Sequence, residues 1–133
     1  MPFLTEAFPA FKKWQGRVAL VFQAIRHARS SDIAFQLGLA ALQDRAALVR
    51  YRACGLLAYS LRDDAVPHLR RLLCHRDPKT VDDARAAIDA IEHQNHHYFV
   101  DRNHSGRLYW ELNERDTADP TARADGEDAA AEP

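Results

Sequence analysis

The sequence predicts an all-α protein, a short right-handed α-α solenoid of about five helices with a C-terminal β-hairpin or loop cap and a disordered acidic tail. Three observations support this prediction. Five successive stretches place apolar residues three and four positions apart, as on one face of a helix. Two to four residues join these stretches, so neighbouring helices must pack antiparallel. Two stretches also resemble each other, with Val49 and Val81 in matching places, at a spacing typical of helical repeats.

The first two helices are expected over residues 14–28 and 33–43. The first has one apolar stripe, formed by Val18, Val21, Phe22, Ile25 and Ala28. Residues 30–32, Ser-Ser-Asp, are of the types that cap a helix N-terminus. Residues 33–43 are apolar nearly all round, which predicts that this second helix lies in the middle of the fold.

The next three helices are expected over residues 47–61, 65–75 and 78–93. The fourth follows two acidic cap candidates and carries Pro67 in its first turn, where a missing N–H costs little. Its leucines, Leu69, Leu72 and Leu73, are predicted to point inward. The Asp77-Pro78 pair is a strong start signal for the fifth helix.

Residues 45–91 carry a resemblance to a known family. A Val-Arg start, small residues in the first helix, a short acidic turn, Ala-Val-Pro and a Leu-rich second helix together resemble HEAT-like repeats. The fifth helix departs from the family pattern because Val81 is followed by Asp82, so its outer edge is expected to differ. The resemblance implies a helical solenoid and most often a protein-binding scaffold, although relatives bind DNA or bilin chromophores.

The composition divides the chain into a folded part, residues 1–114, and a tail, residues 115–133. The tail contains no large apolar residue, which is typical of disorder, and the end of the folded part, from about residue 95 to 114, forms the expected cap. Residues 95–133 carry nine acidic residues against four arginines, whereas the body is mildly basic. Such a balance argues against a nucleic-acid-binding domain, where a strong basic excess is usual.

The sequence favours a cytoplasmic protein. Charged residues interrupt the apolar residues near the N-terminus, unlike those of a signal peptide, and no stretch approaches the roughly 18 to 20 apolar residues of a membrane span. Cys54 and Cys74 both stand among apolar neighbours, where a free thiol usually acts as a small hydrophobic residue. We therefore expect neither a disulfide nor membrane association.

Four histidines fall between positions 93 and 104. His93 and His97 are four residues apart and would share a helix face if the fifth helix ran that far, a spacing that can hold zinc, with Asp101 or His104 as a further ligand. The Glu that follows the first His in metalloproteases is missing. The simpler interpretation is a polar helix end, where His is favoured by the helix dipole. We therefore predict no bound metal or cofactor. His93, His97, Asp101 and His104 are kept as candidate metal ligands.

The segment that follows has two further interpretations. Asp101, Asn103, Ser105 and Gly106 match the first half of a calcium loop, but the twelfth position, which needs a bidentate Glu, is Leu112. The aromatic runs 98–100 and 108–110 flank a turn sequence and favour a β-hairpin that covers the last helix. We expect the hairpin.

No residues have the spacing of a catalytic site, since the serines lack a base and no glycine-rich phosphate loop is present. The sequence therefore favours a binding protein over an enzyme. Two groups of residues could contact a partner. One is the outer stripe of the fourth helix, His68, Arg71 and His75, and the other consists of the aromatic residues Tyr98, Tyr109 and Trp110.

The leading interpretation is a protein-interaction module or adaptor of bacterial type, for example a toxin-neutralising immunity protein. One alternative is a metal-dependent enzyme or metal sensor built on the histidine cluster. Another is a nucleic-acid-binding protein that contacts phosphates through its arginines, namely Arg50, Arg52, Arg70, Arg71 and Arg76.

Overall fold

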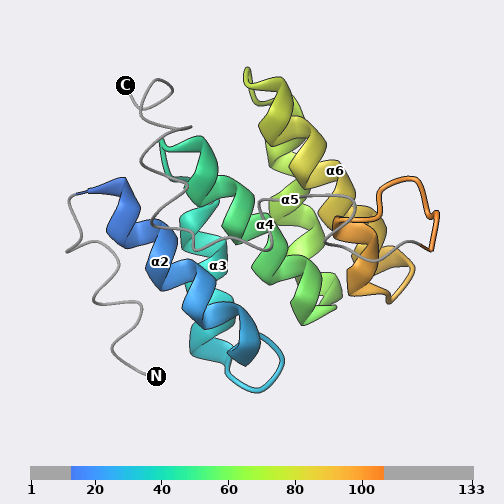
Figure 1. The fold of residues 1–133 in the computed structure, drawn as a ribbon, viewed down its shortest axis with the longest axis horizontal. Coiled ribbons are helices and arrows are strands. Elements are labelled where there is room, and N and C mark those ends of the chain that lie inside the picture. Colours follow the sequence, from blue (N-terminus) through green and yellow to red (C-terminus); the bar gives the residue numbers. More distant parts are fainter. Residues whose placement is uncertain (1–12, 107–133) are drawn as a thin grey trace.

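The computed structural model describes residues 13–106, and this part of the chain is all-α. Its helices are α2 (Trp14–Ala24), α3 (Asp32–Ala41), α4 (Ala47–Ser60), α5 (Val66–Arg71) and α6 (Pro78–Glu92) (Figure 1). Short 3-10 turns extend α2 through His27 and α5 through Cys74. All five helices predicted from the apolar spacing are confirmed, with boundaries that differ by a few residues.

Helix α4 lies in the middle of the fold. It packs against α2 on one side and α6 on the other, while α3 packs behind α4 and α5 packs behind α6 (Figure 1). Eleven of its fourteen residues are buried. The prediction that residues 33–43 would form the central helix was wrong, because Gln36 and Ala40 of α3 are exposed. The sequence of α4 did not indicate its central position, because polar residues such as Arg50 and Arg52 alternate with apolar ones.

The helix starts follow the expected caps in two cases. The Ser31 hydroxyl accepts a hydrogen bond from Ala34 N at 3.3 Å, and the Asp77 carboxylate accepts one from Lys79 N at 3.1 Å. The third expected cap, before α5, does not form. Asp64 instead pairs with Arg62 at 2.7 Å, and a 3-10 turn, Asp63–Ala65, leads into the helix.

A glycine allows α3 to approach α4 closely. A Cβ atom on Gly38 would lie 2.6 Å from Leu56 Cδ2 and 3.1 Å from Leu57 Cδ2, inside van der Waals contact. Both leucines are fully buried, so neither can move aside freely. Leu57 therefore lies in the core, where α3 and α4 meet.

Two ion pairs of the same kind tie successive helices together. The Arg17 guanidinium on α2 donates to Asp44 through Nε at 2.6 Å and Nη2 at 3.1 Å. Arg50 on α4 donates to Asp77 through Nη2 at 3.2 Å. In each pair the aspartate follows the arginine by 27 sequence positions. The number of sequence positions from Arg17 to Arg50 therefore equals the number from Asp44 to Asp77. We call this number of sequence positions the ion-pair interval. The contacts of α2 with the segment after α3 therefore recur between α4 and the segment after α5.

The ion-pair interval also relates two helix ends. Leu61 after α4 and Gln94 after α6 both adopt left-handed backbone conformations, with φ of 57° and 52°. A single left-handed residue commonly ends a helix and turns the chain back. Gln94 also donates its side-chain amide to Leu61 O at 3.0 Å, so the two turns contact each other.

The prediction of a β-hairpin was wrong for its first strand. Residues 98–100 were predicted as a strand, but His96–Phe99 form a 3-10 turn that Asn95 caps. Phe99 is buried against Tyr51 of α4, with ring centroids 5.5 Å apart. The Phe99 side chain must lie on the inner side of a turn to reach Tyr51. This tertiary contact outweighs the preference of a run of aromatic residues for a strand. Residues 98–106 contain no strand.

The second hairpin arm, with Tyr109 and Trp110, lies outside the described residues, as does the tail 115–133. Cys54 is buried as expected, whereas Cys74 is exposed because it ends the short turn after α5. Burial raises the pKa of the Cys54 thiol, so Cys54 acts as an inert core residue. In the described part of the chain, no helix combines the length and apolar character that a membrane span requires.

Candidate functional site

Three side chains meet at the C-terminal end of α6. Asp89 and His93 lie on one face of the helix, and His104 reaches them from the following loop. Asp89 Oδ1 lies 3.0 Å from His93 Nδ1, and Asp89 Oδ2 lies 2.6 Å from His104 Nε2. We call these three residues the Asp-His-His cluster. All their candidate ligand atoms lie within 4.8 Å of one another.

The loop that carries His104 is held by Asp101. One oxygen of the buried Asp101 carboxylate accepts hydrogen bonds from Ser105 N at 2.8 Å and Ser105 Oγ at 2.7 Å. Its other oxygen accepts a bond from Gly106 N at 2.7 Å. These bonds, with that of the Ser105 hydroxyl foremost, lower the pKa of Asp101. The carboxylate thus fixes the loop conformation.

Aromatic contacts orient the two imidazoles. The His104 ring stacks on Tyr98 with centroids 3.8 Å apart and planes 12° apart. The His93 ring meets Tyr98 edge-on at 5.5 Å and His104 at 5.2 Å. His104 itself adopts a left-handed backbone conformation, φ 54°, which is uncommon outside glycine. Tyr98, predicted as a partner contact, therefore acts as a platform for the cluster.

The structure brings together only two, His93 and His104, of the four residues that were kept as candidate metal ligands. His97 lies on the 3-10 turn and packs against the His96 ring at 4.1 Å, away from the Asp-His-His cluster. Asp101 is engaged in closing its loop. The third member of the cluster, Asp89, was missed, although its position four residues before His93 could have revealed it. The calcium interpretation is not supported in the described residues, since Asp101 and Ser105 bond to each other.

A groove of about 640 Å³ runs beside this cluster between α5, α6 and the loop after residue 101. Its apolar part is formed by Leu73, Ala86 and Ile88, and Leu73 is the large apolar side chain most open to solvent among the described residues. Its charged residues are of both signs: Arg70, Arg85, Arg102, Asp82, Asp89 and Glu92. Asp89 and His104 belong to both the groove and the cluster.

The predicted stripe on the fourth helix does not form this groove. Arg70 and Leu73 line it, whereas His68, Arg71 and His75 do not. His75 instead accepts a hydrogen bond from Asp77 N at 3.0 Å, and burial with the nearby Arg50 charge lowers its pKa. The prediction that Leu73 points inward was wrong. The α-helix gives way to a 3-10 turn at Leu72, and the Leu73 side chain that follows is exposed.

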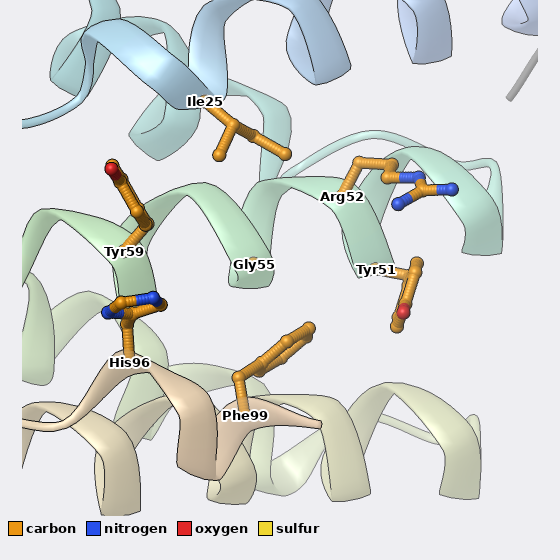
Figure 2. Close-up of a pocket in the computed structure, with 7 residues that line it drawn as sticks. All are labelled: Ile25, Tyr51, Arg52, Gly55, Tyr59, His96 and Phe99. Carbon is orange, nitrogen blue, oxygen red and sulfur yellow. The ribbon is translucent and has the colours of Figure 1, made fainter. Parts of the chain in front are cut away.

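A second hollow, of about 120 Å³, lies where α4 meets the turn after α2 and the His96–Phe99 turn (Figure 2). His96 and Tyr59 lie together at one end, and Phe99 points toward Gly55. The Arg29 guanidinium donates to His96 Nδ1 at 2.9 Å. Burial, together with the charges of His97 and Arg29, lowers the pKa of His96 to about 4. The hollow is well below the roughly 300 Å³ of ordinary ligand pockets.

The arginines suggested for phosphate contacts do not form one surface. Arg50 and Arg52 are buried, with only 6% and 2% of their surface exposed. Arg52 lies over the rings of Phe22 and Tyr51, at 4.7 and 5.2 Å. Arg70, Arg71 and Arg76 are exposed. Two of the five candidates therefore serve the fold.

Comparison with protein-family models, with curated proteins and with solved structures finds no match to this chain.

Proposed function

We propose that this chain is a HEAT-like protein-interaction module and that it binds a short peptide segment of a partner protein in the groove between α5 and α6. The observation that carries the proposal is the groove itself, an apolar strip in which Leu73 is exposed and Ala86 and Ile88 are largely buried, with charged residues of both signs along its edges. Interfaces commonly combine a central apolar contact with a polar rim. The volume, about 640 Å³, is sufficient for a few side chains of a peptide.

The charged edges suit a partner because two of their ion pairs are weak. Arg70 lies 3.9 Å from Glu92, and Arg85 lies 3.6 Å from Asp82, with all four side chains more than half exposed. Exposed pairs of this kind contribute little to stability. They can therefore separate and pair with opposite charges on a ligand at small cost. The ligand that fits is a peptide with an apolar anchor side chain flanked by charges of both signs.

The recurring ion pairs support the HEAT-like part of the proposal. The Arg17–Asp44 contact is repeated one ion-pair interval later by the Arg50–Asp77 contact, and this interval falls in the range of helical-hairpin repeats. Such scaffolds bind partners along extended surfaces made by successive hairpins. A small adaptor or a toxin-neutralising immunity protein would use the surface in this way.

A displayed library of random peptides, selected on the full-length chain, tests the groove. Enriched peptides are then measured for affinity by fluorescence anisotropy against the parent and Leu73→Glu. We expect the substitution to weaken binding about tenfold or more, because it places a charge in the apolar strip. Gln23→Glu, on an exposed part of α2, is the matched control and should leave affinity unchanged. Equal affinity for the parent and Leu73→Glu would exclude this groove.

A further inference from the structure

We propose that Asp89, His93 and His104 form a binding site for a divalent transition-metal ion, with Zn²⁺ as the best-fitting ion. Two imidazoles and one carboxylate are a donor set that zinc prefers, whereas calcium and magnesium require oxygen ligands throughout. The proposal concerns the cluster alone and does not depend on peptide binding in the groove.

The distances within the cluster are close to those of a bound ion. Four ligands at zinc's usual bond length of about 2.1 Å stand roughly 3.4 Å from one another in a tetrahedron. Asp89 oxygens already lie 2.6 Å from His104 Nε2 and 3.0 Å from His93 Nδ1, and all the donor atoms fall within 4.8 Å. The two histidines are exposed, so small side-chain rotations can bring every donor to the ion.

Each donor is attached to a rigid support. Asp89 and His93 occupy positions four apart on α6, whose inner face is buried in the core. The bonds that Asp101 accepts from Ser105 and Gly106 fix the loop around His104. Because the His104 ring also stacks on Tyr98, little conformational freedom is lost when it coordinates an ion. His104 has a left-handed backbone conformation, and its ring nitrogen Nε2 lies 2.6 Å from Asp89 Oδ2.

Three protein ligands leave one tetrahedral position vacant. Since Asp89 and His104 also line the groove, that position opens toward the groove, where water or a ligand carboxylate can occupy it. His104 Nε2 hydrogen-bonds Asp89 Oδ2, whereas His93 Nδ1 lies 3.0 Å from Asp89 Oδ1 and 2.9 Å from the backbone carbonyl oxygen of Asp89. Zinc would replace the proton between Asp89 and His104, and His93 would give up its backbone contact to coordinate the ion. Metal binding therefore requires no new cavity.

Isothermal titration of the tag-free full-length chain with zinc chloride tests the site. We expect one ion per chain in the parent. We also expect at least tenfold weaker binding in Asp89→Asn, His93→Gln and His104→Gln, because each removes one ligand. Binding of Co²⁺ should give the visible absorption of a four-coordinate ion in the parent and lose it in His104→Gln. Circular dichroism of each variant checks that the helices are intact.

His97→Gln is the matched control, because His97 has the same spacing from His93 as a helical zinc pair but lies outside the cluster. It should bind zinc as the parent does. Absence of zinc binding in the parent would overturn the proposal. So would binding that survives loss of His104, or a loss in His97→Gln equal to that in His93→Gln, because the ligands would then be different residues.

Discussion

The guanidinium of Arg50 reaches Asp77 across 27 positions of sequence, with Nη2 at 3.2 Å from Oδ2. The same side chain donates Nε to Thr80 Oγ1 at 2.9 Å and Nη1 to the carbonyl oxygens of Asp44 and Arg45 at 2.9 and 2.7 Å. One buried arginine thus connects the start of α4 with the start of α6 and satisfies two carbonyl groups of the segment between α3 and α4.

Arg50→Ala should lower the free energy of unfolding by about 3 to 5 kcal/mol, because it leaves two backbone carbonyls without this donor and removes the positive charge beside Asp77. Asp77 keeps its bonds from Lys79 N and Thr80 Oγ1. Arg50→Lys should recover only a small part, since an ammonium cannot donate in all four directions. Urea denaturation measures both. Arg71→Ala, on an exposed part of α5, should change stability by less than about 0.5 kcal/mol. A similar small effect for Arg50→Ala would contradict this role.

Gly38→Ala should destabilise the protein by about 1 to 2 kcal/mol. The new methyl group would overlap Leu56 and Leu57, and alanine's better helix propensity offsets only part of this cost. Thermal and urea denaturation give the value. In a Leu56→Ala background the same change should cost less, because the shortened side chain makes room. Equal costs in the two backgrounds would show that the overlap is relieved elsewhere.

Leu57→Ala should cost about 2 to 5 kcal/mol, since Leu57 is fully buried and its truncation leaves a cavity in the core. Leu73→Ala provides the comparison, because 36% of Leu73 is exposed and its loss should change stability only slightly. Parallel denaturation curves of the two variants test the register of the helices. Similar midpoints would be inconsistent with the described core.

Stability should fall as pH decreases from about 6.5 toward 4. His96 has an ordinary pKa of 6.5 in the unfolded chain and about 4 in the folded one, so the unfolded chain binds more protons in this interval. Solvent screening of the half-buried ring limits the loss to about 1 to 2 kcal/mol. Denaturant midpoints across this range measure it. His96→Gln should reduce the slope, and an unchanged slope would assign the effect to other groups.

Asp101→Ala should lower the melting temperature, because the loop after residue 101 loses three hydrogen bonds to one carboxylate. The decrease should be the same with calcium and with a chelator, since the carboxylate acts as a loop closure. Differential scanning fluorimetry provides the comparison. If calcium stabilised the parent and Asp101→Ala abolished this effect, the segment that begins at Asp101 would instead be a calcium loop.

The helices were predictable because local signals produced them. Apolar spacing located all five, and Ser31 and Asp77 act as the caps that their side chains suggested. The turn at His96–Phe99 was not predictable locally. Its conformation follows from Phe99 packing on Tyr51, a contact between residues far apart in the sequence.

The candidate site was predictable only in part. The density of histidines pointed to the correct region, and His93 and His104 are in the cluster. His97 was kept as a candidate, and Asp89 was not considered, on the condition that the helix ran past its predicted end at residue 93. The helix ends at Glu92, so His97 no longer shares a face with His93. Likewise, nothing local distinguishes the buried Arg50 from an arginine available for phosphate.

The series of buried arginines ends with a reversal of charge. Asp83 follows Arg50 by one ion-pair interval, as Arg50 follows Arg17. Asp83 is buried, and it forms an ion pair with Arg102 at 3.0 Å. A further hairpin added at this end would meet a carboxylate where each earlier hairpin supplied a guanidinium. Within the chain, Arg102 compensates this carboxylate, so the third position of the series is neutralised from the loop after residue 101 and not from a further helix.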